Sequence, residues 1–254
     1  MIGHRCIGAL LALVIGSLAL PARAISCENI LFENTPFTIC EVSAQDRPQM
    51  WLRDGAGDIL GGFKAIEAEM GGARLAFAMN AGMYHEDRHP VGLYIEDGRQ
   101  VMPASDGGGY GNFGLLPNGL LCITEDSIRV WESTAWADAA APCRYASQSG
   151  PMLVIDGTLH PAFHEGSSSR YVRNGVGTSD DGSRAVFAIS DSAVNFYDFA
   201  RLFRDHLGLN NALFFDANVS RLYAPALGRA DGGPQVGPIV GVVDGAVDGA
   251  DPAR

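Results

Sequence analysis

The sequence predicts an α+β fold: a single domain with a mixed, largely hairpin-built sheet and a few helices. Short apolar runs alternate with turn dipeptides such as Asp97-Gly98 and Asp181-Gly182, which are typical of tight hairpins. Helical spacing of apolar residues occurs in only a few segments. Near the C-terminus, residues 185–215 show a strand, a helix and a strand within about thirty residues, which predicts one β-α-β crossover with parallel strands.

The N-terminal segment 1–24 is typical of a secretory signal peptide. It has a charged start at His4 and Arg5, an apolar centre over 7–20 and a small-x-small cleavage site at Ala22-Arg23-Ala24. Because the apolar centre is too short to remain as a membrane anchor, we expect cleavage after Ala24 and no stable membrane insertion. The mature protein is expected in the periplasm or outside the cell.

The composition favours one globular domain over 25–243, since the chain is 47% hydrophobic and 19% charged. Residues 244–254, rich in Gly, Asp and Ala, are expected to form a disordered tail. The formal net charge of −11 becomes −13 once the signal is removed, because two arginines and no acidic residue leave with it. So acidic a protein repels phosphate backbones, which excludes nucleic acid as an expected partner.

Four cysteines remain in the exported chain, at positions 27, 40, 122 and 143. An even number in an exported protein suggests two disulfides, for which three pairings are possible. We favour the two local pairs, Cys27 with Cys40 and Cys122 with Cys143. Zinc ligation is the alternative, and the absence of a C-x-x-C pair argues against it.

Strands are expected wherever a short apolar run is bounded by turn residues. These runs are 37–42, 75–79, 91–95, 99–102, 113–116, 120–124, 152–155, 185–189, 212–215 and 236–243. Helices are expected over 63–70, which stops before Gly71, and from Asn195, a favourable N-cap, to Gly208. Residues 132–142 suggest a helical turn, and 159–169 an exposed loop.

Two strand ends carry similar polar turns, Asn80-Ala81-Gly82 and Asp216-Ala217-Asn218. We predict that these two turns meet at one pocket, since side chains that flank one small ligand must converge. The crossover additionally places Asp191 and Asp216 beyond the same end of the sheet.

The sequence motifs of several well-known kinds of active site are absent from this chain. The chain has no G-x-S-x-G elbow, no phosphate-cradling loop with its lysine, and no G-x-G-x-x-G that opens a helix. His85 with His89, and His160 with His164, have metal-ligand spacing for a helix, but Pro90 and Pro161 argue against helical geometry there. We therefore predict no metal and no cofactor.

Five motifs follow one another between about Phe77 and Val243: NAGMY at 80–84, PVGLYIEDGR at 90–99, QSGPMLVIDG at 148–157, RNGVG at 173–177 and NALFFDANVSRLYAP at 211–225. In these motifs and in their order, the chain resembles the phosphodiester glycosidase family. Its members include bacterial relatives of the mammalian uncovering enzyme, which removes N-acetylglucosamine from a phosphodiester link to mannose. The resemblance implies a site lined by Asn80, Gly82, Ser149, Gly150, Arg173, Asp216, Asn218 and Ser220.

The implied reaction is hydrolysis at a sugar's anomeric carbon with a phosphate monoester leaving. We assign Arg173 to the phosphate, because a guanidinium makes two-pronged contacts with such anions, and Asp216 to the sugar, as base or as stabiliser of the cationic transition state. A second carboxylate would complete a glycosidase pair. The candidates are Asp191, Glu165, Glu86 and Asp87, and the sequence does not choose among them.

Ala217 departs from the family, which often has glycine after the aspartate. If the turn needs positive φ at this position, alanine is strained. The principal alternative is therefore a non-catalytic binding protein for envelope or exopolysaccharide phospho-glycans. A phosphodiesterase that cuts on the other side of phosphorus is a weaker alternative. The sequence does not predict the natural substrate or the oligomeric state.

Overall fold

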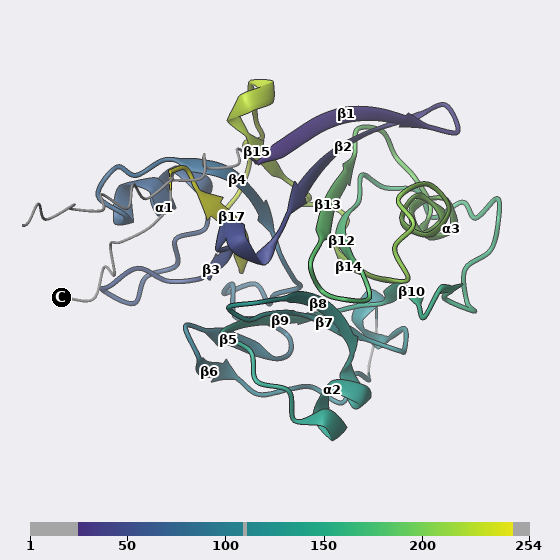
Figure 1. The fold of residues 1–254 in the computed structure, drawn as a ribbon, viewed down its shortest axis with the longest axis horizontal. Coiled ribbons are helices and arrows are strands. Elements are labelled where there is room, and N and C mark those ends of the chain that lie inside the picture. The colour runs from purple at the N-terminus through teal and green to yellow at the C-terminus, as the bar shows by residue number, and fades with distance from the viewer. Residues whose placement is uncertain (1–24, 109–110, 246–254) are drawn as a thin grey trace, which may run out of the picture.

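The computed structural model describes residues 25–108 and 111–245. The predicted signal peptide and residues 246–254 of the predicted tail lie outside this range. The described residues form three antiparallel sheets with helices at their edges, about 39% strand and 16% helix, so the predicted α+β fold class is confirmed (Figure 1).

The largest sheet has the strand order β1-β2-β13-β12-β14-β10-β11. Its strands are β1 (Ser26–Phe32), β2 (Thr35–Val42), β10 (Met152–Ile155), β11 (Thr158–Leu159), β12 (Asn174–Thr178), β13 (Ala185–Ser190) and β14 (Asn211–Asp216). The central strands of this sheet, β12, β13 and β14, are almost entirely buried. Both faces are therefore covered, which explains why these strands read as continuous apolar or glycine runs rather than as alternating ones.

Two five-stranded sheets pack near it. One has the order β16-β15-β4-β17-β3, built from β3 (Gln49–Trp51), β4 (Leu75–Asn80), β15 (Leu222–Ala224), β16 (Arg229–Ala230) and β17 (Ile239–Val243). The other has the order β6-β5-β9-β7-β8, built from β5 (Tyr94–Glu96), β6 (Arg99–Met102), β7 (Gly119–Ile123), β8 (Ile128–Glu132) and β9 (Tyr145–Ser149). One hydrophobic cluster joins residues of all three sheets, including Phe77, Leu121 and Phe215.

The helices are short and lie on the outside of the three sheets. They are α1 (Phe63–Glu69), α2 (Ser133–Ala139) and α3 (Phe196–Arg201), which continues into a π-helical turn, Leu202–His206. Single 3-10 turns occupy Ala44–Asp46, Asn112–Gly114 and Pro225–Leu227. Asn195 caps α3 as predicted, because its side-chain oxygen accepts a hydrogen bond from Asp198 N at 2.8 Å. Phe199 and Phe203 of this segment pack on the largest sheet from the side opposite the other two sheets (Figure 1).

The predicted crossover exists, with one difference in pairing. Strands β13 and β14 both pair antiparallel with β12, which lies between them, so they run parallel to each other without being neighbours. Asn174 is the register partner of both Ile189 and Asp216. Asp191 and Asp216 therefore lie at the same end of the sheet, as predicted.

Most predicted elements are present, and the misses have physical reasons. The predicted strand over 113–116 is wrong, because Asn112–Gly114 forms a 3-10 turn. Strand β9 was missed because it carries three polar residues in its sequence, of which Gln148 is buried and accepts hydrogen bonds from Leu93 N and Ser105 N. Strand β1 was missed because it is an exposed edge strand that pairs only with β2.

Both predicted disulfides are confirmed. Cys27 and Cys40 are register partners on β1 and β2, and Cys122 on β7 bonds Cys143, just before β9. In the part of the chain that the structure covers, no helix is both long enough and apolar enough to span a membrane.

Candidate active site

Four strand ends from the three sheets meet at one place. Asn80 ends β4, Ser149 ends β9, Asn174 begins β12 and Asp216 ends β14. Asn174 and Asp216 face each other across the ladder. Ser149 Oγ donates to the carbonyl of Phe215 at 3.3 Å. Segments that are far apart in the sequence therefore bring the predicted polar residues together.

A buried amide network connects two of the sheets. Asn174 Nδ2 donates to the backbone carbonyl of Asn80 at 2.8 Å and to its side-chain oxygen at 3.0 Å. The same Asn80 oxygen accepts Arg221 N at 2.9 Å. Ser220 Oγ lies 3.2 Å from Asn174 Oδ1. The turns after Asn80 and Asp216 thus lie beside each other, as predicted.

Asn80 retains one free donor. It is fully buried, and its Nδ2 has no hydrogen-bond partner among the described residues. Because an unpaired buried donor costs free energy, its presence in this network favours a binding role over a purely structural one.

Asp216 is a mostly buried carboxyl at the centre of this junction. Burial raises its pKa above the usual aspartate value, and backbone N–H groups of Ala217, Val219 and Asn218 oppose that rise. The positive charge of Arg221 opposes it further. The group therefore combines desolvation with donors that hold its oxygens in place, as a catalytic carboxyl requires.

The turn after Asp216 is unstrained at the position that departs from the family. Ala217 is not among the residues with positive φ in the described chain. Alanine is therefore tolerated here without the predicted strain. Ser220 Oγ lies 3.0 Å from the Asp216 carbonyl and 3.1 Å from that of Ala217, which fixes the turn, and Asn218 is exposed.

Gly82 and Gly150 allow close approach of other residues. A Cβ on Gly82, which has φ +145°, would lie 2.4 Å from Ser147 Oγ. A Cβ on Gly150 would lie 2.0 Å from Asn118 Oδ1. Both glycines therefore shape the wall of the junction through their lack of a side chain.

Arg173 directly precedes β12 and lies on the α3 side of the largest sheet, against Phe196 and Val194, whereas Asn174 contacts Asn80. It is buried, and its guanidinium lies 3.7 Å from the centre of the Phe196 ring. It donates to the carbonyls of Val194 and Ser169, both at 3.0 Å. Burial lowers its pKa to about 10.

Nη1 of Arg173 has no hydrogen-bond partner among the described residues. None of their carboxylates lies within salt-bridge distance of the guanidinium, so its positive charge is not paired there. The structure thus brings Asn80, Asp216 and Ser220 together and places Arg173 on the α3 side.

Sequence reasoning missed three site residues. Tyr84 and Arg221 lie near Asp216: the negative charge of Asp216 raises the pKa of Tyr84, after the larger effect of burial, and Arg221 and Arg88 oppose that rise. Arg88 lies over the Tyr84 ring at 5.3 Å. The sequence feature that could have indicated them is their closeness to predicted site residues, since Tyr84 follows Asn80 by four residues and Arg221 follows Asp216 by five.

The candidate second carboxylates are not equivalent. Asp191 forms a salt bridge with Arg229 and accepts from Thr38 Oγ1, so its oxygens are already engaged. Glu165, Glu86 and Asp87 are exposed. Asp87 also bonds His89 Nδ1 at 2.9 Å. The second carboxylate stays unassigned.

No group of three or more potential metal-ligating side chains gathers anywhere in the described residues. His160 is buried, where it bonds the Leu116 carbonyl and stacks on Phe163. Its role there is packing.

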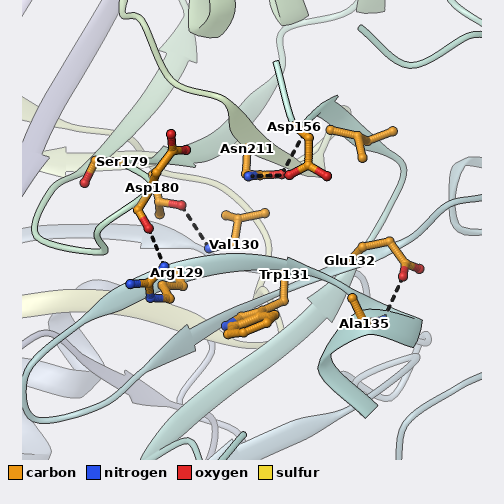
Figure 2. A pocket seen from close by; sticks show the side chains of 11 residues that line it. Arg129, Val130, Trp131, Glu132, Ala135, Asp156, Ser179, Asp180 and Asn211 are labelled. Carbon is orange, nitrogen blue, oxygen red and sulfur yellow. Dashed lines mark hydrogen bonds between the residues drawn. The ribbon is translucent and has the colours of Figure 1, made fainter. Parts of the chain in front are cut away.

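A pocket of about 330 Å³ lies at the other end of the same strands (Figure 2). It is lined by residues such as Trp131, Asn211 and Thr178, and Asn211 is roughly 16 Å along β14 from Asp216. The charged residues in its wall are Glu132, Asp156, Asp180 and Arg129. Because this wall carries a net negative charge, it disfavours an anionic substrate, and the three-sheet junction remains the candidate active site.

Comparison with known proteins defines the class. The family model for phosphodiester glycosidases matches residues 73–232, a range that includes every residue of the junction. This chain belongs to the phosphodiester glycosidase family.

Two individual proteins are also similar to this chain. The uncharacterized protein YigE of Escherichia coli (strain K12) is 31% identical over 208 residues, which cover 80% of this chain and 81% of that protein. Among solved structures, the catalytic domain of zebrafish N-acetylglucosamine-1-phosphodiester alpha-N-acetylglucosaminidase, auto-inhibited by its pro-peptide, matches with a TM-score of 0.60 and 15% identity. That match covers 87% of this chain and 82% of the zebrafish domain, and it shows a shared fold.

Proposed function

We propose that this protein is an exported hydrolase that cleaves the glycosidic bond of a sugar-1-phosphodiester. The observation that carries the proposal is Asp216, a desolvated carboxyl held by backbone N–H groups where three sheets meet. Family membership supports the reaction class, and the two disulfides support an oxidising location, the periplasm or the exterior.

In this reaction water supplies the oxygen that bonds to the anomeric carbon. The bond from that carbon to the phosphate oxygen breaks, and its electron pair leaves with the phosphate. A phosphate monoester has a second pKa near 6. It therefore needs less help from a general acid than an alkoxide does. Asp216 would act on the sugar, as the base for water or as stabiliser of the positive charge at the anomeric carbon.

Substrate contacts would come from the polar groups of the junction. We propose that Asn80, Gly82, Ser149, Gly150, Asn218 and Ser220 line the sugar-binding part. Among them, the free Nδ2 of Asn80 is a donor without a protein partner in the described region. Arg173, with its unpaired Nη1, is the arginine that the family resemblance assigns to the phosphate. We propose no metal and no cofactor.

The test is product release from a panel of sugar-1-phosphodiesters, beginning with a methyl diester of N-acetylglucosamine 1-phosphate. Wild type should release the free sugar, and Asp216→Asn should lower kcat by about a hundredfold or more. Arg173→Ala should also slow turnover. Arg129→Gln, which alters the distal pocket, is the control and should leave turnover unchanged. Unchanged turnover by Asp216→Asn would reject the assignment.

A non-catalytic binding protein for phospho-glycans is the second candidate. The lack of a second assigned carboxylate favours it, whereas the unstrained Ala217 removes one argument for it. Binding of the same diesters with no product from wild type would establish this alternative. Release of a sugar phosphate in place of free sugar would indicate a phosphodiesterase.

A further inference from the structure

Two arginines near Asp216 have guanidinium groups that the protein itself leaves largely unused. Arg221 is only 7% exposed, and its guanidinium makes no hydrogen bond or salt bridge with any described residue. Arg88 donates from Nη1 to the Glu86 carbonyl, while its Nε is buried and has no partner among the described residues. Since arginine donors are seldom left without acceptors inside a protein, the buried Nε of Arg88 and the unpaired guanidinium of Arg221 leave donors available to an anion.

Both arginines act on Tyr84, Arg88 by direct contact with its ring and Arg221 through its positive charge, which opposes the rise in the pKa of Tyr84. Arg88 lies over the Tyr84 ring, 5.3 Å from its centre. Arg221 and Tyr84 each rest on a glycine of the loop 231–237: a Cβ on Gly233 would lie 2.5 Å from Arg221 Nη2, and one on Gly237 would lie 2.7 Å from the Tyr84 ring. The backbone of Arg221 is fixed by Asn80 Oδ1, so the side chain starts from the junction itself.

We propose that Arg221 and Arg88, together with the Tyr84 hydroxyl, form the subsite that holds the phosphate group of the substrate. This inference rests on the proposed function, keeps its reaction and the role of Asp216, and assigns the phosphate to Arg221 and Arg88 rather than to Arg173. Arg173→Ala is then expected to slow turnover only through lost packing on the α3 side. Two planar guanidiniums can supply paired donors to phosphate oxygens and neutralise the charge that develops on the leaving group.

The surroundings fit an anion with a neutral donor beside it. Burial and the nearby Asp216 raise the pKa of Tyr84, so its phenol stays protonated at neutral pH and can donate a hydrogen bond. Arg173, in contrast, already gives three of its donor positions to Val194 and Ser169 and lies under the aromatic ring of Phe196. These contacts fit a structural role for Arg173 on the α3 side of the largest sheet.

The experiment measures binding of glycerol phosphate, a phosphate monoester with no sugar at the reacting bond, by isothermal titration calorimetry. Wild type should bind, and Arg221→Gln should weaken binding by about tenfold or more, since it removes a charge-assisted pair. Arg88→Gln should weaken it in the same direction. Arg221→Lys, which keeps the charge and loses the paired donors, should fall between Arg221→Gln and wild type.

The control is Arg129→Gln, on the far side of the molecule, which should bind glycerol phosphate as wild type does. Melting curves on every variant separate lost binding from lost folding. Wild-type affinity in Arg221→Gln would overturn the proposal, as would loss of binding in Arg173→Gln together with retention in Arg221→Gln. Absence of binding by wild type would overturn it as well.

This binding assay and the turnover assay fail independently. Arginine-dependent binding of glycerol phosphate without any sugar release would reject the hydrolase and keep the anion subsite. If Arg221→Gln and Arg88→Gln release sugar and bind glycerol phosphate as wild type does, the hydrolase proposal stands and the proposed phosphate subsite is rejected.

Discussion

At the residue scale, Asp216 has a cost in stability that follows from its position. Burial raises its pKa, which means that the ionised form is less favourable in the folded protein than in the unfolded chain. This penalty is absent below the unfolded-state pKa, grows as the pH rises from the unfolded-state pKa to the higher folded-state pKa, and is fully present above the latter. A carboxyl kept at such a cost fits the catalytic role that we propose for Asp216.

Asp216→Asn should therefore not lower the free energy of unfolding at neutral pH and is expected to raise it, because the amide carries no charge to desolvate. The difference from wild type should shrink as the pH falls from about 8 into the acidic range, because the carboxyl becomes protonated first in the folded protein and then in the unfolded chain. Thermal melting of both proteins across this range measures the effect. A variant that is less stable at pH 8, by an amount that does not change with pH, would show that the carboxylate stabilises the fold.

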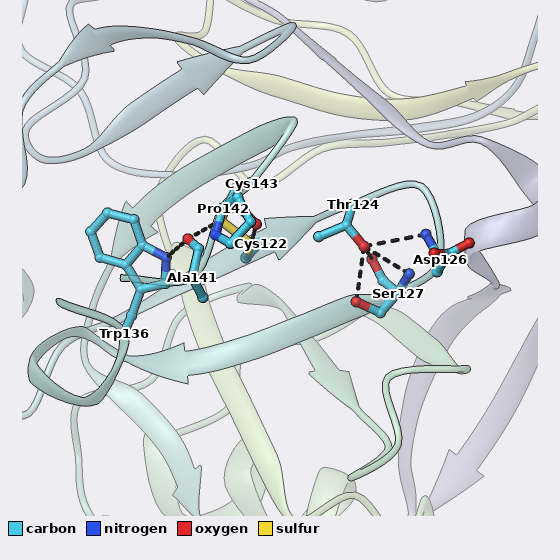
Figure 3. Close-up of a disulfide and its surroundings, with 8 residues drawn as sticks. All are labelled: Cys122, Thr124, Asp126, Ser127, Trp136, Ala141, Pro142 and Cys143. Carbon is cyan, nitrogen blue, oxygen red and sulfur yellow. Dashed lines mark hydrogen bonds between the residues drawn. A yellow bond between two sulfur atoms is a disulfide. The ribbon is translucent and has the colours of Figure 1, made fainter. Parts of the chain in front are cut away.

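At the scale of elements, the disulfide between Cys122 and Cys143 closes a long segment of the chain against the sheet that contains β7 and β9. This segment contains β8 and α2, and Trp136 of α2 donates from Nε1 to the Ala141 carbonyl beside Cys143 (Figure 3). The bridge closes a separation of 21 residues. It therefore restricts the unfolded chain considerably while it fixes the segment that leads into β9 and Ser149.

Replacing both cysteines, Cys122→Ser with Cys143→Ser, should lower the free energy of unfolding by roughly 3 kcal/mol through the greater freedom of the unfolded chain. Urea unfolding under oxidising conditions measures this change. Wild type in reductant, in which both bridges are open, should be less stable still than this variant under oxidising conditions. An unchanged urea midpoint in the variant would show that the bridge does not stabilise the fold.

At the scale of the whole molecule, the site exists because three antiparallel sheets meet at their strand ends. Local patterns predicted the hairpin at Asp97-Gly98, whose residues have φ of 49° and 74°, and the helix that starts at Asn195. They also predicted that the turns after Asn80 and Asp216 converge. These features depend on local spacing and turn chemistry, which a single sequence contains.

The sequence could not predict how the strands divide into sheets or which side of a sheet each side chain faces. The division into three sheets depends on long-range pairings, such as β4 with β15 and β17 and β7 with β9, that no local pattern encodes. Arg173 and Asn174 are adjacent in sequence, yet Arg173 contacts the α3 segment and Asn174 contacts Asn80. Only the fold shows which of the two side chains lies at the junction. For the same reason Arg221 and Tyr84 were overlooked, since they are far apart in the sequence and each packs on a glycine of the loop 231–237.

The most direct test of the central claim is hydrolysis of a sugar-1-phosphodiester in water enriched with oxygen-18, with the label located by mass spectrometry. The proposed reaction breaks the bond between the anomeric carbon and oxygen, so the label should appear in the released sugar and not in the phosphate monoester. Label in the phosphate would place the cleavage on the other side of that oxygen and would contradict a glycosidase.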